Sequence, residues 1–165
     1  MSNRITLRRA AEEDQRAINR LIREGGINPL GTHWSRFVVA LDENGTPVGC
    51  GQVKAHRDGS RELASLAVSR TWRRRGVAGG IVGRLKQIHG QPLWLTCIDR
   101  LVPFYERQAF ERITNPRQMP TYFRRASRLF NLYLLLTRGK GELAVMVWDG
   151  RKDEKFDQSG VYEIS

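Results

Sequence analysis

We predict a mixed α/β or α+β fold from three observations, which are the chain length, the order of the hydrophobic patterns and two hairpin turns. The 165 residues suit one domain with a single layered core. Hydrophobic residues make up 40% and charged residues 27% of the chain, a balance typical of globular proteins. We therefore expect a mainly antiparallel central sheet flanked by helices in residues 1–148, followed by a tail in residues 149–165.

The N-terminal half predicts a strand, a helix and then three antiparallel strands. Residues 4–9 alternate as a strand does, and residues 11–24 place apolar side chains at helical spacing with acids in the first turn. Asn44-Gly45 is a strong hairpin signal, and Arg57-Asp58-Gly59-Ser60 is a second turn. The three strands that these turns connect are expected at residues 36–42, 47–55 and 62–68.

The C-terminal half alternates helices and strands. Pro120 suits the first position of a helix, and the other boundaries follow from periodicity. We expect helices at residues 76–89, 102–108 and 120–136, and strands at residues 93–98, 110–113 and 142–148.

The net charge of +11 is concentrated in the middle of the chain. Residues 70–138 hold 14 basic and three acidic side chains, and the tail from residue 149 is net acidic. This clustering suggests an anionic partner, while scattered solvated arginines are the alternative interpretation. In the predicted helix 120–136, Phe123, Ala126, Phe130 and Tyr133 share one face. Its other face, with Arg124, Arg128 and Asn131, suits solvent, an anionic acceptor, a membrane surface or nucleic acid.

Several protein classes do not fit the sequence. The longest mostly apolar run, residues 129–136, is shorter than the roughly 20 residues of a membrane span. The first residues lack the apolar stretch of a secretion signal, so we expect a cytoplasmic protein. Cys50 and Cys97 are expected to be reduced packing residues, and no cysteine or histidine spacing predicts a metal site.

The segment Arg73-Arg74-Arg75-Gly76-Val77-Ala78-Gly79-Gly80 follows a predicted strand and begins a predicted helix. At a helix start the first backbone N–H groups have no intrahelical partner and the dipole is positive, so this loop suits a phosphate. No Lys follows Gly79 or Gly80 as a Walker loop requires, and the spacing does not match a dinucleotide-binding loop. The remaining ligand is the pyrophosphate of coenzyme A.

The sequence resembles the GNAT family of acyl-CoA-dependent N-acetyltransferases in three segments. Residues 73–78 fit the family signature of Arg or Gln, two variable residues, Gly, one variable residue, and Gly or Ala. Glu62-Leu-Ala-Ser-Leu-Ala-Val68 is similar to the family's fourth strand. Phe104-Tyr-Glu-Arg-Gln-Ala-Phe110 is similar to its FYxxxGF segment, with Ala109 in place of the usual Gly. The resemblance implies that strands four and five splay apart and that acetyl-CoA is the cosubstrate.

The resemblance also implies roles for individual residues. An amine must lose a proton before it attacks a thioester, and Glu62 is the expected general base, although it could simply pair with Arg57 or Arg61. Tyr105 is the expected donor to the departing thiolate, with packing beside Phe104 as the alternative. The expected cofactor-binding residues are Leu66, Ala67, Val68, Arg73, Arg74, Arg75, Gly76, Val77, Ala78 and Gly79, where the amides near Val68 would bind the thioester oxygen.

Two other candidates and two other functions remain at this point. Cys97 could in principle take the acyl group, and His56 could approach Glu62 across the hairpin. The leading hypothesis is direct acetyl transfer to a primary amine of a small molecule or peptide, and the basic surroundings favour an acidic small molecule. The alternatives are a basic nucleic-acid-binding module and a GNAT member that binds coenzyme A without catalysis.

Overall fold

The computed structural model describes residues 4–137 and 143–151. Its helices are α1 (Gln15–Glu24), α2 (Val77–His89), α3 (Val102–Arg107) and α4 (Thr121–Thr137). Its strands are β1 (Thr6–Arg9), β2 (Phe37–Leu41), β3 (Pro47–Ala55), β4 (Arg61–Val68), β5 (Leu93–Ile98), β6 (Glu111–Ile113) and β7 (Leu143–Trp148). Short 3-10 turns lie at Glu12–Asp14, Trp34–Arg36, Arg70–Trp72, Asp99–Leu101 and Pro116–Gln118. The predicted order of strands and long helices is confirmed.

The strands follow the hydrogen-bonding order β1-β2-β3-β4-β5-β7-β6. The pairs β1–β2, β2–β3, β5–β7 and β6–β7 are antiparallel, and β4 pairs with β5 in parallel through Glu62 and Trp94. The fold is therefore the mixed, mainly antiparallel sheet flanked by helices that the sequence predicts.

The chain separates into two compact units. Of the described residues, the first unit contains the chain up to Lys54 together with Leu63–Gly90, and the second contains Ala55–Glu62 and the chain from Gln91 to Arg151. The expected single domain over residues 1–148 stays a prediction, and most of the expected tail, residues 152–165, lies outside the described residues.

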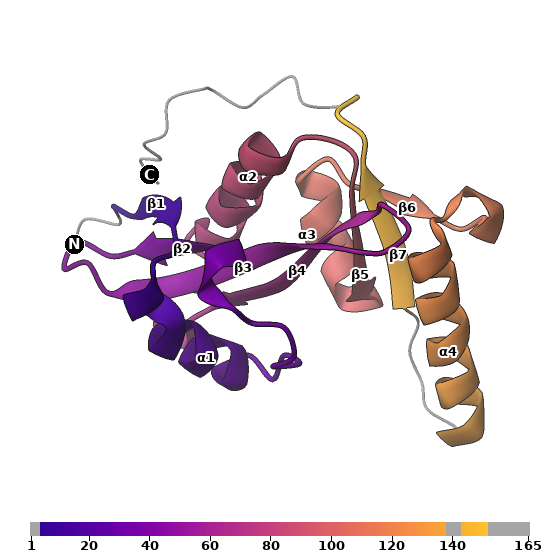
Figure 1. Ribbon diagram of the computed structural model, residues 1–165, viewed down its shortest axis with the longest axis horizontal. Coiled ribbons are helices and arrows are strands. Elements are labelled where there is room, and N and C mark those ends of the chain that lie inside the picture. The colour runs from indigo at the N-terminus through magenta and orange to yellow at the C-terminus, as the bar shows by residue number, and fades with distance from the viewer. Residues whose placement is uncertain (1–3, 138–142, 152–165) are drawn as a thin grey trace. The chain divides into compact units, whose positions relative to one another are not determined.

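In the first unit, α1 and α2 cover opposite faces of the sheet (Figure 1). Ile18, Leu21 and Ile22 of α1 are almost fully buried against Phe37 and Val39 of β2. The alternate residues of β2, Val38 and Ala40, are also buried. Successive side chains of a strand point to opposite faces of the sheet, so a strand with both sets buried is covered on both faces.

The first predicted helix begins later than expected. Residues 12–14 form a 3-10 turn, and the α-helix starts at Gln15. Asp14 accounts for the difference, because its carboxylate accepts bonds from the Ala11 N–H at 2.8 Å and from the Arg8 guanidinium at 2.6 Å. A side chain that binds the backbone three residues earlier competes with regular helix at that point.

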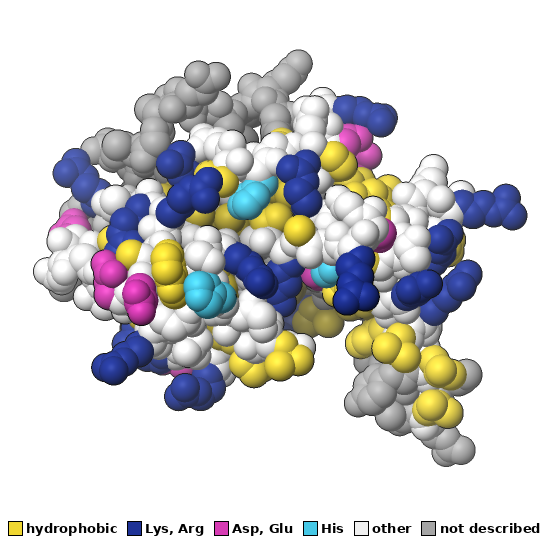
Figure 2. All heavy atoms as spheres, viewed as in Figure 1, with side chains coloured by type: hydrophobic (Ala, Val, Ile, Leu, Met, Phe, Trp, Pro, Cys, Tyr) yellow, Lys and Arg dark blue, Asp and Glu magenta, His cyan; other side chains and the backbone are white. Residues whose placement is uncertain are grey.

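In the second unit, α4 runs alongside β7 (Figure 1). Phe123 is fully buried in a cluster with Met119 and Val145, against which Trp94 and Ile113 also pack. The expected apolar face of this helix is therefore confirmed at Phe123, while the side chain of Tyr133 lies outside the described residues. Figure 2 shows apolar side chains exposed toward the other end of α4, where Leu129, Leu132 and Leu136 are 50–76% exposed.

Candidate active site

The predicted phosphate loop, residues 73–79, lies at the start of α2 in the first unit. Gly76 is the N-cap of the helix and has φ +76°, a left-handed conformation that glycine adopts without steric cost. The first helical bond joins the Gly80 N–H to the Gly76 carbonyl at 3.0 Å. The N–H groups of Val77, Ala78 and Gly79 come before that bond, so they have no intrahelical carbonyl and point along the positive end of the helix.

The three arginines before Gly76 are exposed and hold the loop in different ways. The Arg73 Nε donates to the Val68 carbonyl at 3.2 Å and ties the loop to the end of β4. The Arg75 guanidinium lies 5.3 Å from the centre of the Trp72 ring, within cation–π range. Arg74 has φ +62°, which turns the backbone sharply just before the helix. The loop therefore presents positive charge around a helix start of defined geometry.

Two glycines of β3 allow α2 to approach the sheet closely. A Cβ atom on Gly49 would lie 2.9 Å from Ile81 Cδ1, and one on Gly51 would lie 2.8 Å from Ile81 Cγ2. Both distances are shorter than a relaxed carbon contact, so another residue at either position would force the Ile81 side chain or the helix to move. Alternate glycines in a predicted strand are a signal of close approach that the sequence analysis missed.

The strand β4 changes direction at Ser65, which has φ +55°. Ser65 Oγ accepts a hydrogen bond of 2.9 Å from Nε2 of Gln52, a fully buried side chain that also donates to the Gly31 carbonyl at 3.1 Å. Such an irregularity re-aims the backbone groups of the residues that follow it. Those residues are Leu66, Ala67 and Val68, whose amides the sequence predicts as donors to the thioester oxygen.

The candidate base Glu62 belongs to the second unit and is mostly removed from solvent. Its Oε2 lies 2.9 Å from His56 Nε2, and the two side chains are 12% and 15% exposed. The Tyr122 ring stacks on the His56 ring with centroids 3.4 Å apart and planes 15° apart. Burial raises the pKa of Tyr122, as do the charge of Glu62 and a hydrogen bond to it. We call His56, Glu62 and Tyr122 the carboxylate cluster.

Asp58 connects the turn of the β3–β4 hairpin to the start of α4. Its carboxylate accepts bonds from the Ser60 hydroxyl at 2.6 Å, the Ser60 N–H at 3.0 Å and the Tyr122 N–H at 2.7 Å. The Ser60 hydroxyl and these amides lower the pKa of Asp58 to about 2. Asp58 therefore stays charged and holds the backbone of Tyr122 next to His56.

The candidate acid Tyr105 is buried between two other rings. It is 8% exposed and makes edge contacts with Phe104 and Phe110 at centroid distances of 4.9 and 5.8 Å. Burial raises the pKa of Tyr105, and charge on the nearby Cys97 would raise it further. The phenol is thus held in the protonated form that a proton donor needs.

Cys97 is a weak candidate for covalent chemistry. Its thiol lies 3.8 Å from the sulfur of Met146, and burial raises its pKa to about 11. Burial likewise raises the pKa of Cys50 to about 12. Because the thiolate is the reactive form of cysteine, neither side chain is an activated nucleophile.

Within the second unit, the structure places Glu62 and Tyr105 on opposite faces of the sheet. Glu62 is paired with Trp94, which packs on Phe123 of α4. Tyr105 lies instead beside Cys97, and residues 94 and 97 of one strand point to opposite faces.

The second unit brings Glu62 together with His56, which the sequence analysis named as a possible neighbour, and with Tyr122 and Asp58, which it did not identify as residues of the site. The predicted cofactor-binding residues lie together in the first unit. Among the described residues, no group of three His, Cys, Asp or Glu side chains is arranged to hold a metal ion. No helix in the described part of the chain is both long and apolar enough to cross a bilayer.

Comparison with solved structures finds several acetyltransferases of the same fold. N-acetylglutamate synthase from Neisseria gonorrhoeae, complexed with coenzyme A and N-acetyl-glutamate, is 21% identical, with a TM-score of 0.65 over 88% of this chain and 35% of that chain. Rv2747 from Mycobacterium tuberculosis, in complex with CoA, is 22% identical, with a TM-score of 0.67 over 87% of this chain and 98% of that one. The ribosomal-protein-S18-alanine N-acetyltransferase from Escherichia coli is 16% identical, with a TM-score of 0.60 over 92% and 99% of the two chains.

The extent of these matches differs between relatives. This chain spans about a third of the Neisseria synthase but nearly all of the Mycobacterium and Escherichia proteins. No curated protein sequence matches it significantly. Residues 33–112, from the 3-10 turn before β2 through α3 to the start of β6, match the family model described as Acetyltransferase (GNAT) domain. Residues 33–112 therefore match a GNAT acetyltransferase domain, and the chain has the fold of solved acetyltransferases.

Proposed function

We propose that the protein is an acetyl-CoA-dependent N-acetyltransferase that moves an acetyl group directly to a primary amine of a small molecule or peptide. The observation that carries the proposal is the phosphate loop, where a left-handed Gly76 and three arginines precede the start of α2. Backbone amides and guanidinium groups are the donors that a pyrophosphate prefers, so the residues present fit coenzyme A. Acetyl-CoA would supply the activated carbonyl on which the protein's own groups act.

Each step of the proposed reaction is assigned to a residue or a group of backbone amides. Glu62 takes a proton from the acceptor ammonium, which leaves a neutral amine able to attack. The amides of residues 66–68, re-aimed by the turn at Ser65, donate to the oxygen on which negative charge develops. Tyr105 gives its proton to the departing thiolate, and the second proton that leaves the nitrogen as the amide forms returns to Tyr105 through solvent.

The acceptor is proposed to be an amine that also carries a carboxylate. Residues 70–138 contribute an excess of positive charge equal to that of the whole chain, +11, and Figure 2 shows basic side chains spread over the visible face. Acceptors named for similar structures are chemically varied, since they include L-2,4-diaminobutyric acid and a ribosomal-protein alanine. A cytoplasmic location stays a prediction of the sequence.

Thiol release from acetyl-CoA in the presence of a panel of amino acids, diamines and peptides tests the proposal. We expect at least one amine to give release, with the Glu62→Gln variant about a hundredfold or more slower. Glu43→Gln is the matched control, because Glu43 is an exposed carboxylate in the turn between β2 and β3. Equal rates for Glu62→Gln and the control would remove Glu62 from the role of base.

Calorimetric titration with acetyl-CoA separates this function from the two alternatives. Binding with no turnover on any amine would favour a GNAT member that binds coenzyme A without catalysis. Absence of acetyl-CoA binding, together with DNA or RNA binding that falls steeply with salt, would favour the nucleic-acid module.

A further inference from the structure

His56 is placed against Glu62 by the backbone of the hairpin. The His56 N–H donates to the Ser60 carbonyl at 2.9 Å and the Gly59 N–H to the His56 carbonyl at 3.0 Å, which closes the turn between β3 and β4. Asp58 reinforces the same turn through its bonds to Ser60. The turn therefore fixes the backbone from which His56 approaches the carboxylate, and the imidazole ring itself is oriented by its contacts with the Tyr122 and Phe123 rings.

Glu62 needs partners because most of its surface is removed from water. A buried carboxylate without hydrogen-bond donors is strongly unfavourable. His56 Nε2 supplies one donor at 2.9 Å, and the Tyr122 hydroxyl supplies another. Two side-chain donors hold a carboxylate in one orientation, whereas an exposed glutamate at the end of a strand is free to rotate.

Tyr122 covers the pair from α4. Its ring stacks on His56 at 3.4 Å, and the Phe123 ring meets the same imidazole edge-on at 6.0 Å. The bond from the Tyr122 N–H to Asp58 keeps this helix end in place. The charged or titratable groups that the described structure places against His56 are thus Glu62, Asp58 and Tyr122.

We propose that His56 is a positioning residue for Glu62 and that Tyr122 clamps the pair. His56 keeps its Nε2 proton and donates it to Oε2, so that Glu62 presents its remaining lone pairs to the acceptor amine. The proton that leaves the amine goes to Glu62 and then to solvent, and His56 neither gains nor loses a proton in the cycle. This inference rests on the proposed function, since it assigns a task to the neighbour of its base.

Two substitutions at His56 separate positioning from proton transfer. Glutamine places an amide N–H near the position of the imidazole Nε2–H, but it does not take up a proton at neutral pH. We expect His56→Gln to keep kcat within about fivefold of the wild type and His56→Ala to lower it by about ten- to a hundredfold. The KM for acetyl-CoA should change less than about twofold in both variants, because the phosphate loop is untouched.

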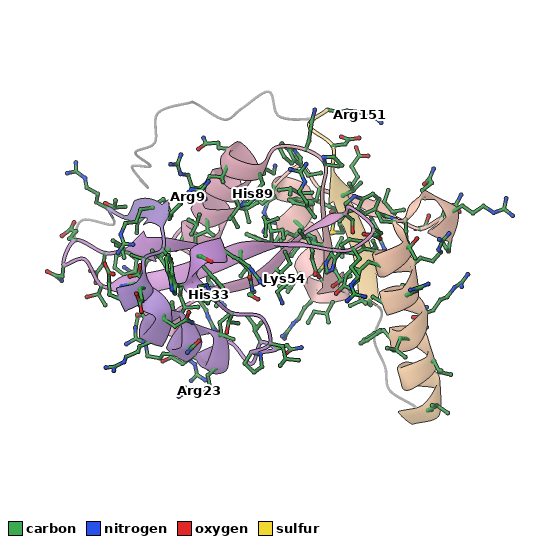
Figure 3. The ribbon with its side chains drawn as sticks, in the orientation of Figure 1. Arg9, Arg23, His33, Lys54, His89 and Arg151 are labelled. Carbon is green, nitrogen blue, oxygen red and sulfur yellow. The ribbon has the colours of Figure 1, made fainter. Side chains whose placement is uncertain are left out.

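The pH–rate profile gives a readout that a merely structural role would not move. A carboxylate that loses a hydrogen-bond donor is protonated more readily, so the acidic limb of kcat should move to higher pH in His56→Ala and return in His56→Gln. Tyr122→Phe keeps the stacked ring and removes one donor, so it should shift the limb in the same direction. His89→Gln, at the C-terminal end of α2 (Figure 3), is the matched histidine control.

The outcomes distinguish failure of this inference from failure of the proposed function. If the wild type is active and Glu62→Gln is impaired, an unchanged kcat and pH profile in His56→Ala would overturn the positioning role. Loss in His56→Gln as large as in His56→Ala would show that His56 itself moves a proton, which also overturns it. If no amine is acetylated, nitrogen NMR at pH 8 still tests the contact. The Nε2-protonated tautomer with a slowly exchanging proton supports it, and the other tautomer contradicts it.

Discussion

The turn that follows α3 contains an alanine in a conformation that favours glycine. The Phe110 N–H donates to the Tyr105 carbonyl at 3.0 Å and the Ala109 N–H to the Glu106 carbonyl at 2.9 Å, which is the bond pattern of a Schellman cap. The rings of Phe110 and Tyr105 provide the accompanying apolar contact. Ala109 has φ +61°, so its Cβ atom is strained where the related motif has Gly.

Replacing Ala109 with glycine should therefore stabilise the protein. Left-handed backbone costs a residue with a Cβ atom about 1–2 kcal/mol. Removing this strain stabilises the folded state, but glycine also has more freedom than alanine in the unfolded chain, which costs roughly 0.4–1 kcal/mol of folding free energy. The net gain should be about 0.5–1 kcal/mol, and for a chain of this size it should raise the Tm by about 1–4 °C.

Urea unfolding followed by circular dichroism measures this change. Ala17→Gly is the matched control, because Ala17 lies in the right-handed helix α1, where the same substitution should destabilise by roughly 0.5–1 kcal/mol. The two variants should shift the midpoint in opposite directions with equal m-values. A lower midpoint for Ala109→Gly would show that packing of the methyl group outweighs the backbone strain, and the reasoning would fail.

Four further predictions concern the site and its support. Tyr105→Phe should lower kcat about a hundredfold or more with little change in the KM for acetyl-CoA, and equal rates would return Tyr105 to a packing role. Because burial raises the pKa of Tyr105, its contribution to stability is present below about pH 10 and is lost at higher pH, so base titration should unfold the wild type before Tyr105→Phe. Gly51→Ala should lower the free energy of unfolding by about 1–3 kcal/mol, since the new Cβ would meet Ile81 at 2.8 Å; denaturation with an unchanged midpoint would contradict this close packing. At pH 8, iodoacetamide should modify Cys50 and Cys97 in the folded protein roughly a hundredfold or more slower than in urea, and rapid labelling would show that one thiol is not buried.

The long elements of the fold could be predicted because their signals are local. Apolar spacing predicted α2 and β5 to within one residue at either end. The turn at Asn44-Gly45 also formed, with Gly45 at φ +76°. The start of α1 could not be predicted in the same way, because the bonds of Asp14 to Ala11 and Arg8 depend on how the strand before it is placed.

The features of the candidate site also differ in whether a local sequence signal predicts them. The phosphate loop was readable because a strand end, arginines, Gly76 and a helix start are contiguous in the sequence. The alternate glycines Gly49 and Gly51 were also readable, as a sign of close helix approach, but they were overlooked. Tyr122 carried no local signal that connects it with Glu62.

The sequence by itself determined the order of the secondary structure and the position of the loop that suits coenzyme A, since backbone preference and hydrophobic period act over a few residues. Only the tertiary structure decided what surrounds Glu62. Asp58 and the Tyr122 N–H that it binds are 64 residues apart, and they meet because buried Phe123 packs α4 against the sheet. Contacts across such a separation depend on the packing of the whole unit, which no short stretch of sequence encodes.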